Sequence, residues 1–480
     1  MTSDGQSIER LREYLRNLKP EAQSMLIQEL ERSLLRGEEN AGNELVLQEL
    51  RRAIRTGAKA VPRIGDAARL FFTPLEPFLL DVPADHKRIG RIARMSLEPI
   101  WAWIGRDLIP AEAKALREDI NRALLAGDRA KADQLARALQ ERATQRMRDA
   151  VAAIGLDDQA RRRLAVRVGT PRAIDDLNTV LSLFVLNEAL REFGRRLPSQ
   201  IRVFERDQID AIKSQLDALV VQTSPLEAGG IRKSDVFLYG LILVMNRLAA
   251  PWQLIRIATR AAESDDTARV AETPYAAAVT LVLSEVENMV GELRIELRAG
   301  RPIVSMLKAI HDAARGLRSE MDLSVESPWS RQLATMRAEV SGLLRTEIEA
   351  TPGFVRRLLR PRPTKEIASG SLLDPLDVNQ AEMRVEFVDA CRHYASELAI
   401  NEVTTRAHSE LTLYLETGTK ALLDSLRQAG PGERPFRQSQ VDAAIRFCRS
   451  VFGSEYAGLL AKAAEVAVQS GTAERKPARA

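Results

Sequence analysis

The stretch SPWSRQLATMRAEVSGLLRTEIE, residues 327–349, carries the pattern that decides the fold. Apolar side chains recur along it at intervals close to one helical turn, at Leu333, Met336, Val340, Leu343 and Ile348. This spacing places them on one face of an α-helix. Ser327 before Pro328 supplies a capping hydroxyl and a proline at the first helical position, which is a typical helix start.

The same 3.6-residue period continues along the whole chain. Helices are predicted over 7–18, 20–36, 43–59, 111–126, 129–154, 158–167, 172–196, 206–221, 233–248, 251–263, 274–299, 302–320, 328–349, 378–428 and 439–469. Alternating strand patterns of any length are absent, and residues 202–204 are interpreted as a loop. The sequence therefore predicts an all-α protein, an elongated or multi-bundle array of antiparallel helices with one irregular segment.

The sequence predicts further helix starts and ends. Thr170 and Thr273 each precede a proline and are predicted to cap helices in the same way as Ser327. Gly127 follows an apolar helical stretch and suits the left-handed residue that closes a helix.

Composition limits the class of protein. The chain has 480 residues, of which 45% are hydrophobic and 28% charged, so it is too long for one core and too apolar to be disordered. Its net charge is only +4, which counts against a dedicated nucleic-acid-binding protein. With two cysteines, a polar start and no apolar run of membrane-spanning length, we expect a bacterial cytoplasmic protein.

Breaks in the helical pattern predict seven segments. They are N-terminal helical hairpins (1–60), an irregular segment rich in proline and aromatic residues (61–110), a helical unit (111–221), a helical bundle (233–350), a basic proline-rich linker (351–376), a C-terminal helical unit (377–470) and a disordered tail (471–480). The linker carries the helix-breaking residues Pro352, Pro361, Pro363 and Gly370 between two periodic stretches.

The irregular segment 61–110 repeats one motif, as Leu75-Glu76-Pro77-Phe78 and as Leu97-Glu98-Pro99-Ile100. It holds six of the 21 prolines. If its aromatic and basic side chains are exposed, they form a partner-binding patch, since tryptophan and arginine dominate interaction hot spots. The residues of this hypothesis are Phe71, Phe72, Phe78, Arg88, Arg91, Arg94, Trp101 and Trp103. If they are buried, as large aromatics usually are, they close the end of a helical bundle.

Two clusters of basic residues support a different hypothesis, the binding of an anionic surface. They are Arg161, Arg162 and Arg163 near a helix end, and Arg356, Arg357, Arg360, Arg362 and Lys365 in the predicted linker. Such clusters can hold an anionic membrane or a nucleic acid. The simpler interpretation is a solvated linker that its charge keeps soluble.

Signatures of catalysis are missing. The sequence has no Gly-x-Gly-x-x-Gly, phosphate-binding loop, Gly-x-Ser-x-Gly, His-Glu-x-x-His or Cys-x-x-Cys motif, so we single out no catalytic residue, metal ligand or cofactor. An enzyme remains an alternative if acids of the irregular segment share a cleft with its histidine, namely Glu76, Asp81, His86, Glu98 and Asp107. The leading prediction is a non-enzymatic interaction or scaffold protein whose partner is another protein.

Overall fold

The computed structural model describes residues 66–81, 87–153, 157–224, 231–299, 303–324 and 326–473, together with Leu26 and Val46 alone. The chain divides into two compact units, Met1–Arg69 and Leu70–Ala480. Almost all described residues belong to the second unit, whose fold follows here. The hairpins predicted in 1–60, His86 and the end of the predicted tail beyond 473 lie outside the described residues.

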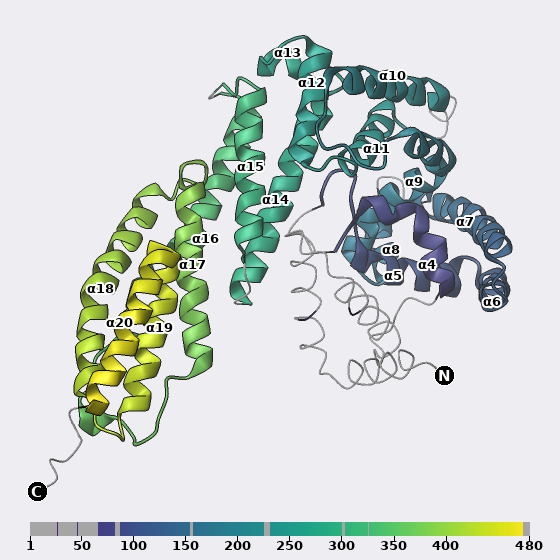
Figure 1. The fold of residues 1–480 in the computed structure, drawn as a ribbon. Coiled ribbons are helices and arrows are strands. Elements are labelled where there is room, and N and C mark those ends of the chain that lie inside the picture. Colours follow the sequence, from purple (N-terminus) through teal and green to yellow (C-terminus); the bar gives the residue numbers. More distant parts are fainter. Residues whose placement is uncertain are drawn as a thin grey trace, which may run out of the picture. The chain divides into compact units, whose positions relative to one another are not determined.

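The described ranges contain seventeen α-helices, which confirms the predicted all-α class (Figure 1). They are α4 (Asp66–Phe72), α5 (Leu97–Trp103), α6 (Pro110–Leu125), α7 (Arg129–Ala152), α8 (Asp158–Val168), α9 (Pro171–Arg196), α10 (Arg206–Thr223), α11 (Lys233–Met245), α12 (Ile255–Ala262), α13 (Thr267–Ala271), α14 (Ala276–Arg298), α15 (Val304–Glu320), α16 (Pro328–Leu359), α17 (Pro375–Leu398), α18 (Asn401–Gln428), α19 (Arg434–Phe452) and α20 (Ser454–Ala473). Within these ranges, each helix is too short or too polar to span a lipid bilayer.

The described part of segment 61–110 is irregular, as predicted. A 3-10 helix, η1 (Thr73–Phe78), follows α4, and a π-helical turn, η3 (Ile104–Leu108), follows α5. Between them, β1 (Leu79–Leu80) pairs in parallel with β2 (Ile92–Ala93) over two residues. Both copies of the Leu-Glu-Pro motif place their glutamate in the first turn of a short helix, where a carboxylate faces free N–H groups.

Helices α9 and α11 form the centre of the N-terminal half. Buried apolar residues lie on most sides of α9, from Ala173 to Phe193, and α11 buries nearly every residue from Val236 to Met245. Helices with apolar residues all round belong in a core. Around α9 pack α7, α8, α10, α11 and η1.

Helices α16 to α20 pack on one another in the C-terminal part (Figure 1). Residues Leu333, Met336, Val340 and Ile348 of the predicted apolar stripe are buried, but Leu344 takes the buried place predicted for Leu343. Helix α16 also continues through Pro352 to Leu359, so the first nine residues of the predicted linker are helical. The side chains of Thr351 and Pro352 are buried in this packing, which outweighs the backbone hydrogen bond that the proline removes.

Three predicted elements differ in their boundaries. The single helix expected over 378–428 is two helices, α17 and α18, separated at Ala399, whose φ of 56° is left-handed. Likewise, Gly453 with φ of 90° separates α19 from α20. The helix expected over 251–263 is a 3-10 turn, η5 (Pro251–Leu254), followed by α12.

The predicted caps are mostly confirmed. The hydroxyls of Thr170 and Ser327 accept hydrogen bonds from backbone N–H groups in the first turns of α9 and α16, and Gly127 has a left-handed φ of 76°. The prediction that Thr273 caps a helix was wrong, because its hydroxyl donates to the carbonyl of Val270 at 2.9 Å and α14 begins only at Ala276.

Candidate functional site

The aromatic residues predicted to form a surface patch lie in the core. Phe71, Phe72, Phe78 and Trp103 are each at most 2% exposed. Phe71 packs edge-on against Phe184 of α9 at a ring distance of 5.2 Å, and Trp101 is half-buried beside it. The hypothesis of an exposed aromatic patch is therefore wrong for these four rings. Phe71 and Phe72 cover Phe184 of α9, and Phe78 packs against Tyr239 of α11.

The arginines of the same segment hold it in place. Arg91 is 7% exposed, donates to the carbonyl of Pro77 at 3.0 Å and pairs with Glu285 of α14 at 3.4 Å. Burial lowers the pKa of Arg91, and Glu285 partly offsets that effect. Arg88 pairs with Glu287 of the same helix. These two side chains therefore fasten the segment to α14 and are not available as surface charges.

Arg94 is the third predicted arginine, and it lies at the surface between two of the acids considered for catalysis. It donates to both carboxylate oxygens of Glu76, at 3.1 and 3.0 Å, and pairs with Asp81. The hydrogen bond with Glu76 is the largest cause that raises the pKa of Arg94. An arginine that already binds two carboxylates has little capacity for a third.

A buried aspartate on α9 fixes the segment from the other side. Asp176 is 1% exposed and accepts hydrogen bonds from the Ser96 hydroxyl at 2.7 Å and the Ala93 N–H at 3.0 Å. Lys87 forms an ion pair with it. No pattern in the sequence predicts this contact, because the partners lie about eighty residues apart and single aspartates in helices are common.

A pocket of about 440 Å³ lies beside the irregular segment, and we call it the arginine-rimmed pocket. Its walls come from α7, α9, the end of α11 and η1. The apolar residues that line it include Leu70, Pro74, Pro77, Phe78, Leu183, Leu190 and Leu243. Five arginines and one aspartate, Asp133, also line it, and these arginines are Arg129, Arg137, Arg191, Arg195 and Arg247. The lining thus combines an apolar floor with a net charge of +4.

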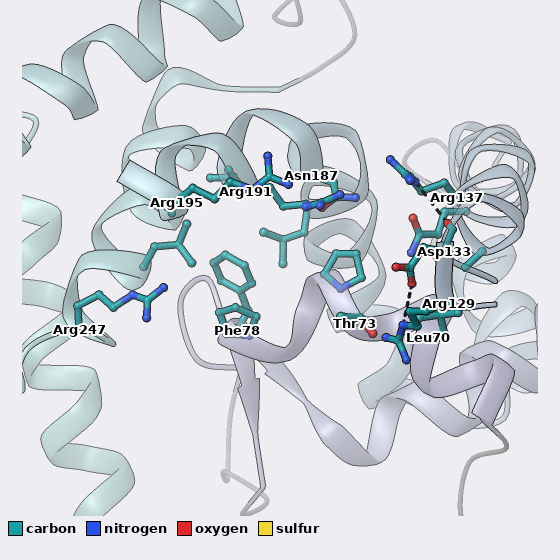
Figure 2. A pocket seen from close by; sticks show the side chains of 18 residues that line it. Leu70, Thr73, Phe78, Arg129, Asp133, Arg137, Asn187, Arg191, Arg195 and Arg247 are labelled. Carbon is teal, nitrogen blue, oxygen red and sulfur yellow. Dashed lines mark hydrogen bonds and ion pairs between the residues drawn. The ribbon is translucent and has the colours of Figure 1, made fainter. Parts of the chain in front are cut away.

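Figure 2 shows how the charges are distributed around the pocket. Arg247 lies on one side of Phe78, Arg195 and Arg191 lie along α9, and Arg137 and Arg129 lie on the far side on α7. The arginines therefore surround the apolar residues and are not gathered at one end. An anion that enters meets guanidinium groups on several sides.

The arginines of the pocket differ in how far they are neutralised. Arg129 pairs with Asp133 at 3.2 Å, and Arg191 pairs with Glu188 at 3.7 Å. Arg137 donates to the backbone carbonyl of Asp133 at 3.3 Å. Among the described residues, Arg137, Arg195 and Arg247 have no carboxylate partner. These three keep their full charge for a ligand.

Helix ends explain why such arginines are tolerated next to one another. Arg195 lies in the last turn of α9, and Arg247 follows the end of α11 by two residues. The C-terminal end of a helix carries partial negative charge and stabilises a nearby cation. Arg247 also donates to the carbonyl of Ser199 at 3.4 Å.

Of the eight residues predicted to bind a partner, all of them described, Phe78 alone lines this pocket. Sequence reasoning missed the five arginines. A signal was present, because Arg129, Asp133 and Arg137 are each four residues apart, as are Arg191 and Arg195, and this spacing places charges on one helix face. The sequence does not reveal that these two faces meet at a hollow.

The basic clusters predicted to bind anionic surfaces lie elsewhere. Arg161 pairs with Asp175 at 2.6 Å, while Arg162 and Arg163 are exposed on α8. In the second cluster, Arg356 pairs with Glu410 at 2.6 Å and Arg360 with Glu366 at 3.8 Å. Arg357 lies over the ring of Phe354, Arg362 lies over that of Phe436, and Lys365 is exposed.

The linker that carries the second cluster is attached to α19 and the turn before it. Gln440 donates to the carbonyl of Arg360 at 3.0 Å. The backbone N–H of Gly370 donates to the carbonyl of Gly432 at 2.9 Å. Several of its charges are therefore held in ion pairs or over rings, which leaves fewer of them for a surface.

The acids considered for catalysis do not converge. Glu76 and Asp81 meet at Arg94, Asp107 pairs with Arg106 at 2.9 Å, and Glu98 is exposed. These four acids are not among the lining residues of the arginine-rimmed pocket. In the described part of the chain, no three His, Cys, Asp or Glu side chains are grouped so as to hold a metal ion.

Comparisons with known proteins add no relative to this picture. Family models, curated proteins and solved structures were searched, and none of them matches the chain.

Proposed function

We propose that the protein is a non-enzymatic interaction protein and that its partner, another protein, binds at the arginine-rimmed pocket. The observation that carries this proposal is the composition of the lining: an apolar floor surrounded by five arginines, three of them without a carboxylate partner among the described residues. Apolar pockets with a few convergent charged groups are the usual form of a binding site. Arginine is also a preferred residue of interaction hot spots.

The lining favours binding over catalysis. Asp133 is its single carboxylate, and the described lining residues include no histidine, cysteine or lysine. Arginine stays protonated in proteins and so cannot act as a general base. General acid–base chemistry would fall to Asp133, which is already paired with Arg129, and the described lining offers no other side chain that could take a proton from a nucleophile.

A pocket-filling variant tests the proposal. A Cβ at Gly194 would have Leu243 as its nearest neighbour at 3.9 Å, so Gly194→Leu can project a side chain into the hollow. Leucine also favours a helix more than glycine does, and α9 should therefore keep its fold. Gly342→Leu on α16 is the matched control, because open space surrounds Gly342.

The experiment is a selection from a random peptide library on the full-length chain. We expect enriched peptides that bind the wild-type protein and the Gly342→Leu protein equally and that lose binding to Gly194→Leu. Circular dichroism checks that both variants keep their helix content. Enriched peptides that bind Gly194→Leu as well as wild type, or a selection that enriches none, would refute the proposal.

A further inference from the structure

We infer that the partner's segment in the arginine-rimmed pocket is an acidic amphipathic helix, with apolar side chains on the floor and carboxylates at Arg195 and Arg247. This inference rests on the proposed function, since it names the chemistry of the segment that binds. It assigns Arg195 and Arg247 as the residues that determine specificity.

The two edges of the pocket differ in charge, and this difference sets the position of the ligand's acids. At the α7 edge, Asp133 pairs with Arg129 at 3.2 Å, so Arg137 is the one arginine of that edge without a carboxylate partner among the described residues. At the α9–α11 edge, Arg195 and Arg247 have no carboxylate partner among the described residues. A carboxylate gains most beside a guanidinium that is not already paired. The acids of the ligand therefore belong at the α9–α11 edge.

The spread of the arginines favours a polypeptide over a lipid head group. A single phosphate or carboxylate engages one or two arginines, whereas here arginines lie on α7, on α9 and in the turn after α11 around the floor (Figure 2). Acids spaced along a polypeptide match charges at several positions. The floor is also recessed, because Phe78, Leu183 and Leu190 are buried. A flat bilayer would meet the arginines without reaching that floor.

The backbone surroundings favour a helix over an extended segment. The residues that line the pocket come from helices and the turn after α11, so in the described chain no strand edge contributes to its lining. An extended peptide relies on such an edge for its backbone hydrogen bonds, while a helix satisfies its own. A volume of about 440 Å³ suits a ridge of apolar side chains spaced three and four residues apart.

Fluorescence anisotropy with the full-length protein tests the inference. The probe is a labelled helix-forming peptide with a stripe of leucines at i, i+3, i+4 and i+7 and glutamates beside it. One control peptide has the same residues in scrambled order, and another has lysine in place of glutamate. The protein variant is Arg195→Glu with Arg247→Glu. Its matched control is Arg162→Glu with Arg163→Glu, which makes the same change in charge at exposed positions of α8.

We expect the striped acidic peptide to bind and both control peptides to bind at least about tenfold more weakly. The Arg195/Arg247 variant should lose about tenfold or more in affinity, while the Arg162/Arg163 variant should stay within about twofold of wild type. Circular dichroism confirms that both variants remain folded.

Three results would overturn the inference. The scrambled peptide could bind equally well, the Arg162/Arg163 variant could lose as much affinity, or vesicles of phosphatidylcholine and phosphatidylserine could bind through Arg195 and Arg247 where the peptide does not. The library selection separates this failure from that of the proposed function. If the selected peptides bind wild type but not Gly194→Leu, and are neutral or extended, the proposed function stands and the inference of an acidic helix is refuted.

Discussion

Single buried charges hold the irregular segment to the helices, and we expect their substitution to affect stability most. Arg91 and Asp176 come from different parts of the chain, and each is nearly enclosed. A buried charge is stable only when it is paired and hydrogen-bonded. Asp176 meets that condition through Lys87, Ser96 and the backbone of Ala93.

Asp176→Ala should lower the free energy of unfolding by about 2–4 kcal/mol, because the substitution leaves the Ser96 hydroxyl and the Ala93 N–H buried without an acceptor. The neighbouring Asp175→Ala is the matched control. It removes an exposed ion pair with Arg161, which should lower the free energy of unfolding by less than about 1 kcal/mol. Urea unfolding followed by circular dichroism measures both. Equal losses for the two variants would mean that Asp176 is no anchor.

The two cysteines should be unreactive in the folded protein. Burial raises the pKa of Cys391 and Cys448 from 9.0 to about 12. The folded chain therefore binds these protons more tightly than the unfolded chain, so their contribution to stability is full below pH 9.0 and is lost as the pH rises toward about 12. A disulfide reagent at pH near 8 should label both thiols in urea and neither at a comparable rate in native buffer. Rapid native labelling would contradict their burial.

At the scale of helices, glycines show how packing overrides propensity. Gly316 lies inside α15, where an added Cβ would meet the ring of Trp252 at 2.4 Å. Gly342 lies inside α16 with nothing within 4 Å. Both glycines lie inside helices, but the space beside Gly316 is filled and the space beside Gly342 is empty.

Alanine should therefore have opposite effects at these glycines. Gly316→Ala should destabilise the protein by about 1–3 kcal/mol through the clash with Trp252. Gly342→Ala should stabilise it by up to about 1 kcal/mol through better helix propensity. Thermal unfolding of the two variants measures the signs. A gain at Gly316 would show that Trp252 moves aside without cost.

The break between α17 and α18 depends on contacts from α16. Arg337 donates to the carbonyls of Ser396 at 3.0 Å and Glu397 at 2.5 Å, and the Ser341 hydroxyl donates to that of Ala399 at 3.0 Å. These donors satisfy carbonyls that the end of α17 leaves open. Ala399 carries the left-handed turn without the glycine that usually supplies it.

Ala399→Gly should stabilise the C-terminal helices by about 1 kcal/mol, because glycine adopts a left-handed φ without the clash of a Cβ. Ala395→Gly, four residues earlier inside α17, should cost about 1 kcal/mol or more, since it is helical and buried. Denaturant midpoints compare the two proteins. A loss at Ala399 would contradict the left-handed assignment.

For the whole molecule, the balance of charge matters more than its total. The net charge is only +4, and many surface arginines are paired with acids on their own or a neighbouring helix. Exposed pairs of this kind contribute little each. Against this background, the three pocket arginines without a carboxylate partner in the described part of the chain are a local excess of positive charge.

Salt should therefore separate folding from binding. Raising sodium chloride screens charges across the surface, so the melting temperature should change little, while affinity for an acidic peptide should fall steeply. Thermal scans and anisotropy titrations at low and high salt measure the two effects. Peptide affinity that does not respond to salt would contradict a role for the arginines.

The sequence by itself determined the helical class, most helix boundaries and the irregularity of 61–110, because periodicity, caps and prolines act through neighbours along the chain. It left open whether Trp103 and Phe71 are exposed. Only the tertiary structure decided that these rings are buried, that α17 stops before Ala399, and that the arginines of α7, of α9 and of the turn after α11 surround one hollow. Those outcomes depend on which helix faces meet, and contacts between residues far apart in sequence leave no periodic trace in it.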